Sequence, residues 1–95
     1  PVKFGLHSNY PNPFNPSTEI SFILNYQSHV NLEIFNFRGE LVKNLLRNSY
    51  TPKSEQITKV WDGCDSSGSR CSSGVYFYKL TTSKETFVNK MIMTK

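Results

Sequence analysis

The chain has 95 residues, which is enough for one domain and too few for two. It contains no Ala, the best helix former, and its Ser, Thr and Asn beside Val, Ile, Leu, Phe and Tyr suit β-strands joined by polar turns. The formal net charge is +4, but the Lys and Arg residues are scattered, which argues against nucleic-acid binding, and no apolar run reaches the roughly 18 residues that a membrane span needs.

The first eighteen residues predict a short edge strand followed by an extended arm. Residues 3–7 alternate apolar with polar or small side chains, as an edge strand does. Three prolines within residues 9–18 exclude both a helix and a central strand. We therefore expect an ordered arm that wraps the domain, with Tyr10 and Phe14 as its apolar anchors.

Six further segments have the length and pattern of strands. Residues 41–46 carry apolar side chains at helical spacing, but this short stretch follows a hairpin turn at Gly39 and lacks a cap, so we still predict a strand. Residues 48–54 are predicted to be a polar loop, and residues 62–74 a long turn region. The predicted strands are residues 19–25, 29–37, 41–46, 56–61, 75–82 and 87–94.

About seven short strands with regular turn signals predict an all-β fold, an immunoglobulin-like antiparallel β-sandwich. We assign residues 1–95 to a single domain, in which residues 1–18 form the proline-rich strand and arm and residues 19–95 form the sandwich. The inter-sheet disulfide of antibody domains is not expected, because both cysteines follow Trp61 and lie close together.

The sequence offers no catalytic constellation, so we expect no enzyme activity. The two histidines stand alone, and no serine lies in a nucleophile elbow. Asp62 and Asp65 lie in the long turn region, where we expect them to cap backbone N–H groups. A calcium site at these two aspartates is the weaker alternative, because the stretch lacks the EF-hand pattern. We expect no other metal and no cofactor.

The strand at residues 75–82 has two interpretations. Tyr76 and Tyr78 could be stacking platforms for a sugar, or their rings could fill the core of the sandwich. We favour the core, since small β-domains build their cores from such residues. The redox state of Cys64 and Cys71 also has two interpretations, because the two residues would pair in an oxidising compartment and stay free thiols in a reducing one.

Several landmarks follow one another in a distinctive order along nearly the whole chain. A proline-rich opening at residues 6–22 is followed by Trp-Asp-Gly, then by Ser-Gly-Val-Tyr-Phe-Tyr, and finally by Lys-Met-Ile-Met-Thr-Lys. This order resembles the type A C-terminal sorting domains of the type IX (Por) secretion system. The immunoglobulin-like module of flagellar hook-capping proteins shares the Trp-Asp-Gly landmark. The structural motif residues are Asn12, Pro13, Phe14, Asn15, Pro16, Trp61, Asp62, Gly63 and Gly74.

The resemblance implies a non-catalytic sorting signal at the end of a larger secreted cargo protein. Such domains pass through the periplasm, are recognised by the outer-membrane type IX translocon, and are removed at the cell surface by a sortase-like peptidase that joins the cargo to anionic lipopolysaccharide. We accordingly expect the 95 residues, which open at Pro1 without Met, to be a monomeric segment of a longer chain. The family usually has other residues at positions 64 and 71, so the paired cysteines suggest a local disulfide.

The resemblance also points to the last residues as the part that the translocon recognises. A terminal strand at a sheet edge offers backbone groups to which a partner can add, although the same stretch can be a purely structural strand. Two other functions remain open: a carbohydrate-binding or spacer module of an extracellular enzyme, and an assembly module like the hook-cap domain. The predicted recognition residues are Lys90, Met91, Ile92, Met93, Thr94 and Lys95.

Overall fold

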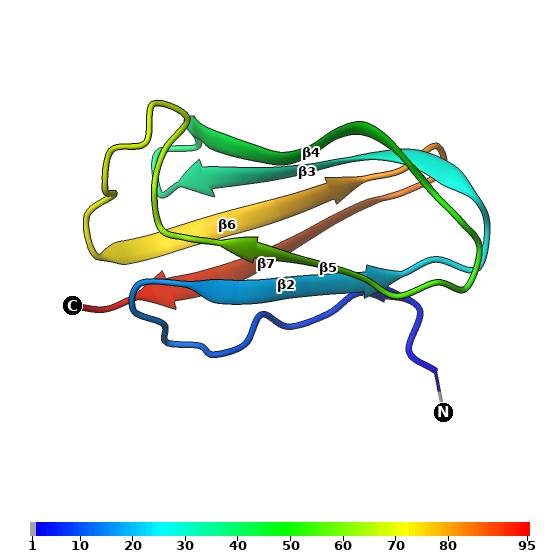
Figure 1. The fold of residues 1–95 in the computed structure, drawn as a ribbon, viewed down its shortest axis with the longest axis horizontal. Helices are drawn as coiled ribbons and strands as arrows, with labels where there is room; N and C mark the ends of the chain where they lie inside the picture. The colour runs from blue at the N-terminus through cyan, green and yellow to red at the C-terminus, as the bar shows by residue number, and fades with distance from the viewer. Residues whose placement is uncertain (1) are drawn as a thin grey trace.

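The domain is a sandwich of two antiparallel sheets, seen in a computed structural model that describes residues 2–95 (Figure 1). Pro1, the first residue of the predicted arm, lies outside the described residues. The three-stranded sheet has the order β1-β2-β5 and the four-stranded sheet the order β4-β3-β6-β7, which confirms the predicted all-β class. The strands are β1 (Gly5–Leu6), β2 (Thr18–Ile23), β3 (Ser28–Asn36), β4 (Leu41–Thr51), β5 (Ile57–Trp61), β6 (Gly74–Thr81) and β7 (Thr86–Met93).

The core lies between the two sheets and follows from the alternation of side chains along each strand. In β3 alternate residues from Ser28 to Ile34 are buried, and its neighbour β6 buries alternate residues on the same side of the sheet. The strand β2 presents its buried residues from the other sheet. No helix within residues 2–95 has the length and apolarity needed to cross a membrane. The buried cluster consists of Leu6, Phe14, Ile20, Phe22, Leu24, Val30, Leu32, Ile34, Trp61, Tyr76, Tyr78, Leu80, Met91 and Met93.

The strand β4 differs from the prediction in length. It continues to Thr51, so the polar loop predicted at residues 48–54 is wrong for its first half. The pairing of β3 with β4 changes register at three places, and Asn48 has a positive φ of 45° near one of them. These irregularities let the adjacent residues Leu45 and Leu46 both pack against the core, which explains the helical spacing in the sequence.

The arm is anchored by one aromatic ring and not by two. Phe14 is 1% exposed, as predicted, but Tyr10 is 78% exposed and is not an anchor. Buried polar side chains hold this part of the arm instead. The amide of Asn9 donates to the hydroxyl of Thr18 at 3.0 Å, and that hydroxyl donates to the carbonyl of Pro11 at 2.9 Å.

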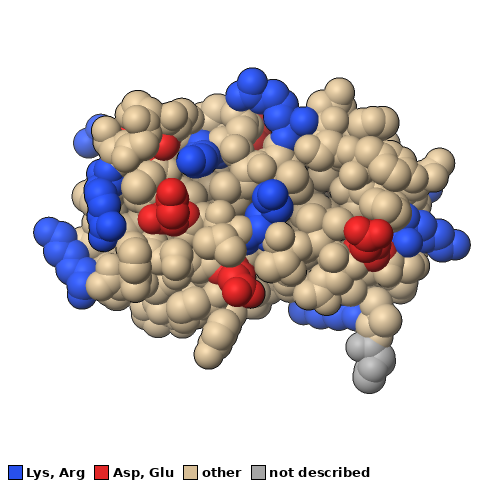
Figure 2. All heavy atoms as spheres, viewed as in Figure 1, with Lys and Arg blue, Asp and Glu red and all other residues tan. Residues whose placement is uncertain are grey.

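Charged side chains are spread over the surface. On the face in Figure 2, Lys and Arg side chains lie apart from one another, with uncharged atoms between them. Within residues 2–95 the single ion pair joins Lys79 to Glu33 at 3.8 Å. This face therefore carries no continuous basic stripe of the kind that binds nucleic acid.

Candidate functional site

The arm and the last strand meet at one end of the sandwich, where the C-terminus also lies (Figure 1). Phe14 pairs in parallel with Met93: its N–H donates to the carbonyl of Ile92 at 3.0 Å, and its own carbonyl accepts from the N–H of Thr94 at 2.9 Å. The side-chain carbonyl of Asn12 accepts from the N–H of Ile92 at 3.0 Å. The structure thus joins the proline-rich motif to the predicted recognition residues by direct hydrogen bonds.

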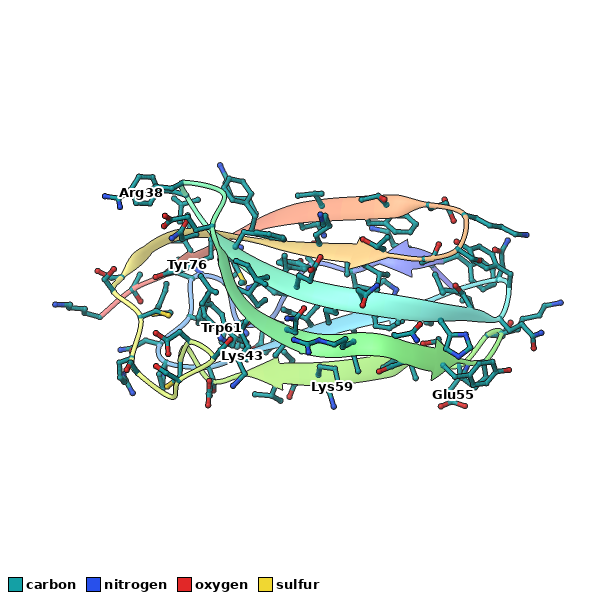
Figure 3. The ribbon with its side chains drawn as sticks, turned by 90° about the horizontal axis from the view of Figure 1, so that it is seen from above. Arg38, Lys43, Glu55, Lys59, Trp61 and Tyr76 are labelled. Carbon is teal, nitrogen blue, oxygen red and sulfur yellow. The ribbon has the colours of Figure 1, made fainter. Side chains whose placement is uncertain are left out.

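Trp61 is the centre of an aromatic cluster beneath this junction. The rings of Phe14 and Tyr76 both meet the indole of Trp61 in edge geometry, with centroid distances of 5.7 Å and 5.1 Å. Figure 3 shows Trp61 and Tyr76 at the same end of the sandwich, with Glu55 at the other end. The indole N–H of Trp61 donates to the carbonyl of Cys64 at 2.9 Å, so this buried ring also fixes the following loop.

Gly63 is required by the close approach of the arm. Its φ is +80°, and a Cβ at this position would lie 2.6 Å from the carbonyl oxygen of Pro16 and 3.3 Å from the methyl group of Met93. No real Cβ tolerates the first contact, and the left-handed backbone itself favours glycine. Gly74, by contrast, opens β6 opposite Met93 with free space around it.

The two aspartates of the loop cap backbone groups. Asp62 accepts from the N–H of Cys64 at 3.0 Å, and Asp65 accepts from the N–H groups of Ser67 and Ser69, each at 3.0 Å. The hydrogen bond from the Ser67 hydroxyl contributes most to lowering the pKa of Asp65 below its ordinary value. Among residues 2–95 no three His, Cys, Asp or Glu side chains gather as a metal site would need.

The disulfide suggested by the resemblance is absent, because Cys64 and Cys71 are both free thiols. The loop pairs Cys64 with Arg70, and the N–H of Cys71 donates to the carbonyl of Gly63 at 2.9 Å. The two cysteines are therefore offset by one residue in register, and neighbouring positions along paired strands face opposite sides. A disulfide requires Cβ atoms about 4 Å apart, which this offset does not favour.

The last strand divides the predicted recognition residues into two groups. Met91 is fully buried and Met93 is 6% exposed, so both side chains belong to the core. Lys90, Ile92, Thr94 and Lys95 are exposed. Only this second group can contact a partner of the folded domain.

The buried tyrosines do not form a sugar-binding platform. Tyr76 and Tyr78 lie on the inner face of β6, 5% and 0% exposed, which confirms the prediction that they fill the core. Burial raises the pKa of both phenols. The hydroxyl of Tyr78 donates to the carbonyl of His7 at 2.8 Å and accepts from the amide of Asn89 at 3.1 Å, so it ties the arm to β7.

Sequence reasoning missed two buried polar residues that hold the arm in place, Asn9 and Thr18. Asn12, which was predicted as a motif residue, bonds to the last strand by its side chain. Short polar residues near prolines look like ordinary turn residues. An irregular segment has no repeating pattern of buried positions, so the sequence does not show which of its polar residues are buried. Asn9 and Thr18 do bracket the proline-rich stretch, which is the one signal that was available.

The sequence matches the family described as "Secretion system C-terminal sorting domain" over residues 8–94. Among solved structures, the chain is similar to a dimeric latent PorU from Porphyromonas gingivalis, at 24% identity and a TM-score of 0.74 over 94% of this chain and 9% of that one. It is also similar to PorZ, described as a surface component of the type-IX secretion system of the same organism, at 21% identity and a TM-score of 0.68 over 96% of this chain and 12% of that one.

These likenesses establish the shared sandwich fold. The chain spans about a tenth of the length of each of these two structures. No curated protein matches the sequence.

Proposed function

The chain belongs to the family of secretion system C-terminal sorting domains, and from this premise we propose that residues 1–95 act as one non-catalytic sorting signal for a larger cargo protein. The family implies sorting by type IX secretion, toward the cell surface or the extracellular space. The match over residues 8–94 carries the proposal, because it includes both the arm and the last strand.

The proposed partners are the outer-membrane translocon and a sortase-like peptidase. The cargo, fused ahead of residue 1, enters the periplasm, where the sandwich folds and the translocon recognises it. The peptidase then removes the domain at the cell surface. The pairing of Phe14 with Met93 supports recognition of the folded domain, because that pairing exists only when the sandwich is complete.

Within this proposal the exposed side chains of the last strand contact the translocon. Lys90, Ile92, Thr94 and Lys95 supply these contacts, whereas Met91 and Met93 act by keeping the strand in the core. Deleting residues 90–95 would therefore remove core packing together with recognition. Substitutions at exposed positions separate the two effects.

The test is a reporter protein with an ordinary export signal, fused to residues 1–95 in a bacterium that has the type IX system. The reporter should reach the cell surface, while the same reporter without the domain should stay in the periplasm. Equal surface signal from both proteins would refute the sorting role. Mass spectrometry of the surface-delivered reporter tests removal separately, since a peptidase would leave it without residues 1–95.

A further inference from the structure

The outer face of the four-stranded sheet carries more apolar surface than a solvent-facing sheet needs. Along β6 and β7 the inward-facing residues alternate with residues that point outward, and half of these outward residues are apolar. Leu41 is 50%, Val88 55% and Ile92 39% exposed. We call this surface the outer stripe, and its members are Phe35, Leu41, Val75, Phe77, Val88, Lys90 and Ile92.

The strand register makes the outer stripe continuous. Phe35 lies opposite Leu41 on β4 and opposite Phe77 on β6, and Phe77 in turn lies opposite Lys90 on β7. Val75 lies opposite Ile92. Directly opposed Cβ atoms are about 4.5–5.5 Å apart, so these side chains touch across all four strands.

A hollow of about 230 Å³ extends the outer stripe at one end. It lies between the β3–β4 hairpin and the start of β6, with Phe37, Arg38, Gly74 and Val75 in its lining. Phe37 is 70% exposed, and the guanidinium of Arg38 lies 5.4 Å from the centre of its ring. Figure 3 shows Arg38 at this corner, on the tip of the hairpin. No carboxylate lines the hollow.

Two cations on or beside this surface, Lys90 and Arg38, have no ion-pair partner within residues 2–95, whereas the third is paired. This third cation, Lys79, is paired with Glu33 at 3.8 Å and covers the ring of Phe35 at 5.0 Å. A second copy laid on the same face would bring like charges together, whereas a carboxylate from another protein would complement both Lys90 and Arg38.

The edge of β7 is a less suitable docking site than this face. The arm already binds the backbone of Ile92 and Thr94. Nearer the middle of the strand, the space between arm and β7 is a hollow of about 200 Å³ lined by Asn12 and Lys90 among others. The amide of Asn89 donates to the carbonyl of His7 at 3.3 Å here, so the first part of the chain lies beside this stretch of the edge and obstructs an added strand.

We propose that the outer stripe is the docking surface for a protein of the export machinery whose contact surface combines apolar side chains with carboxylates that face Lys90 and Arg38. The proposal rests on the sorting function, and it identifies the face of the folded domain that is recognised and the side chains that a partner must present. Contiguous exposed apolar surface of this kind marks protein contacts in soluble domains. The outward residues of the last strand supply one side of it.

The test uses the reporter fusion with Val88→Asp and, separately, Lys90→Glu. Each has a matched control away from the outer stripe: Val60→Asp, at a residue 56% exposed on β5, and Lys53→Glu, at an exposed residue between β4 and β5. We expect the two stripe variants to lower surface delivery about tenfold or more, as loss of a central contact does. The controls should be delivered like the unmodified fusion.

The outcomes separate the two proposals. An unmodified fusion that stays in the periplasm refutes the sorting function, whereas delivery of the stripe variants equal to that of their controls refutes the outer stripe alone. Lys90→Glu lies at an exposed position, so it decides the result if Val88→Asp lowers the denaturation midpoint. Reversible dimerisation of the unmodified chain in sedimentation, abolished by Val88→Asp, would also overturn the proposal, because the occupant would be a second copy.

Discussion

Phe14 donates its N–H to the carbonyl of Ile92 at 3.0 Å, and so joins the proline-rich arm to the last strand of the sandwich. The same residue inserts its ring beside Trp61. The arm is therefore a second backbone partner for β7, beside β6, and it also fills part of the core with the Phe14 ring. Substitutions in the arm should act on the stability of the whole sandwich.

Phe14→Ala tests this filling of the core. The ring is 1% exposed, and removing a buried Phe costs about 3–5 kcal/mol of the free energy of unfolding, a large part of the total for a small domain. Tyr10→Ala is the control in the same arm, because Tyr10 is 78% exposed and its loss should change stability by about 0.5 kcal/mol or less. Urea denaturation followed by tryptophan fluorescence measures both. Similar losses from the two variants would contradict the assigned anchoring.

Gly63→Ala tests the contact between the arm and the loop. Gly63 and Gly39 both have a φ of +80°, but only at Gly63 would the new Cβ meet another atom, the Pro16 carbonyl oxygen at 2.6 Å. Both alanine variants should lose about 1–2 kcal/mol from the left-handed backbone. Gly63→Ala should lose about 1–3 kcal/mol more from the clash. Equal denaturation midpoints for the two alanine variants would show that the arm moves away from the new Cβ without loss of stability.

Tyr78 should make stability depend on alkaline pH. Burial raises the pKa of its phenol, because the anion is disfavoured inside the sandwich. The stabilisation is fully present below the ordinary tyrosine pKa and is lost as the pH rises through the raised value. Tyr78→Phe should show a shallower alkaline loss, and at neutral pH it should be about 1–3 kcal/mol less stable because His7 and Asn89 lose their partner. Parallel pH profiles of the two proteins would argue against this.

Cys71 should react slowly with alkylating agents. Burial, followed by the charge of Asp65, raises the pKa of its thiol, and the thiolate is the reactive form. In a Cys64→Ser variant, where Cys71 is the only thiol, the pH of half-maximal alkylation should be higher in the folded protein than in urea. Identical profiles in the two conditions would contradict the raised pKa.

The sequence was sufficient to predict the strands, but it predicted the buried face of some strands and not of others. In residues 75–82 the preference for tyrosine rings in the core correctly placed Tyr76 and Tyr78 inside. In the last strand nothing separated the buried Met91 and Met93 from the exposed Ile92 between them, and all three were assigned to recognition. Which side of a strand faces the core depends on the opposite sheet, and that is a property of the folded chain.

Long-range pairing was the other limit. The partner of Phe14 lies near the far end of the sequence, and a proline-rich segment has no period from which to find it. The resemblance suggested a disulfide because Cys64 and Cys71 both replace the family's usual residues, yet the two are free thiols and are offset by one residue in register. The irregular pairing of β4 with β3 left a signal in the helical spacing of its apolar residues, but that spacing did not identify a bulge.

The late position of the partner of Phe14 has a consequence during synthesis. A chain that stops before Met91 lacks both core methionines and the backbone to which Phe14 binds. Such a truncated product leaves the ribosome with an unfinished sandwich. Only a chain that is translated through Thr94 can form the closed domain, because the partners of Phe14 lie at residues 92–94.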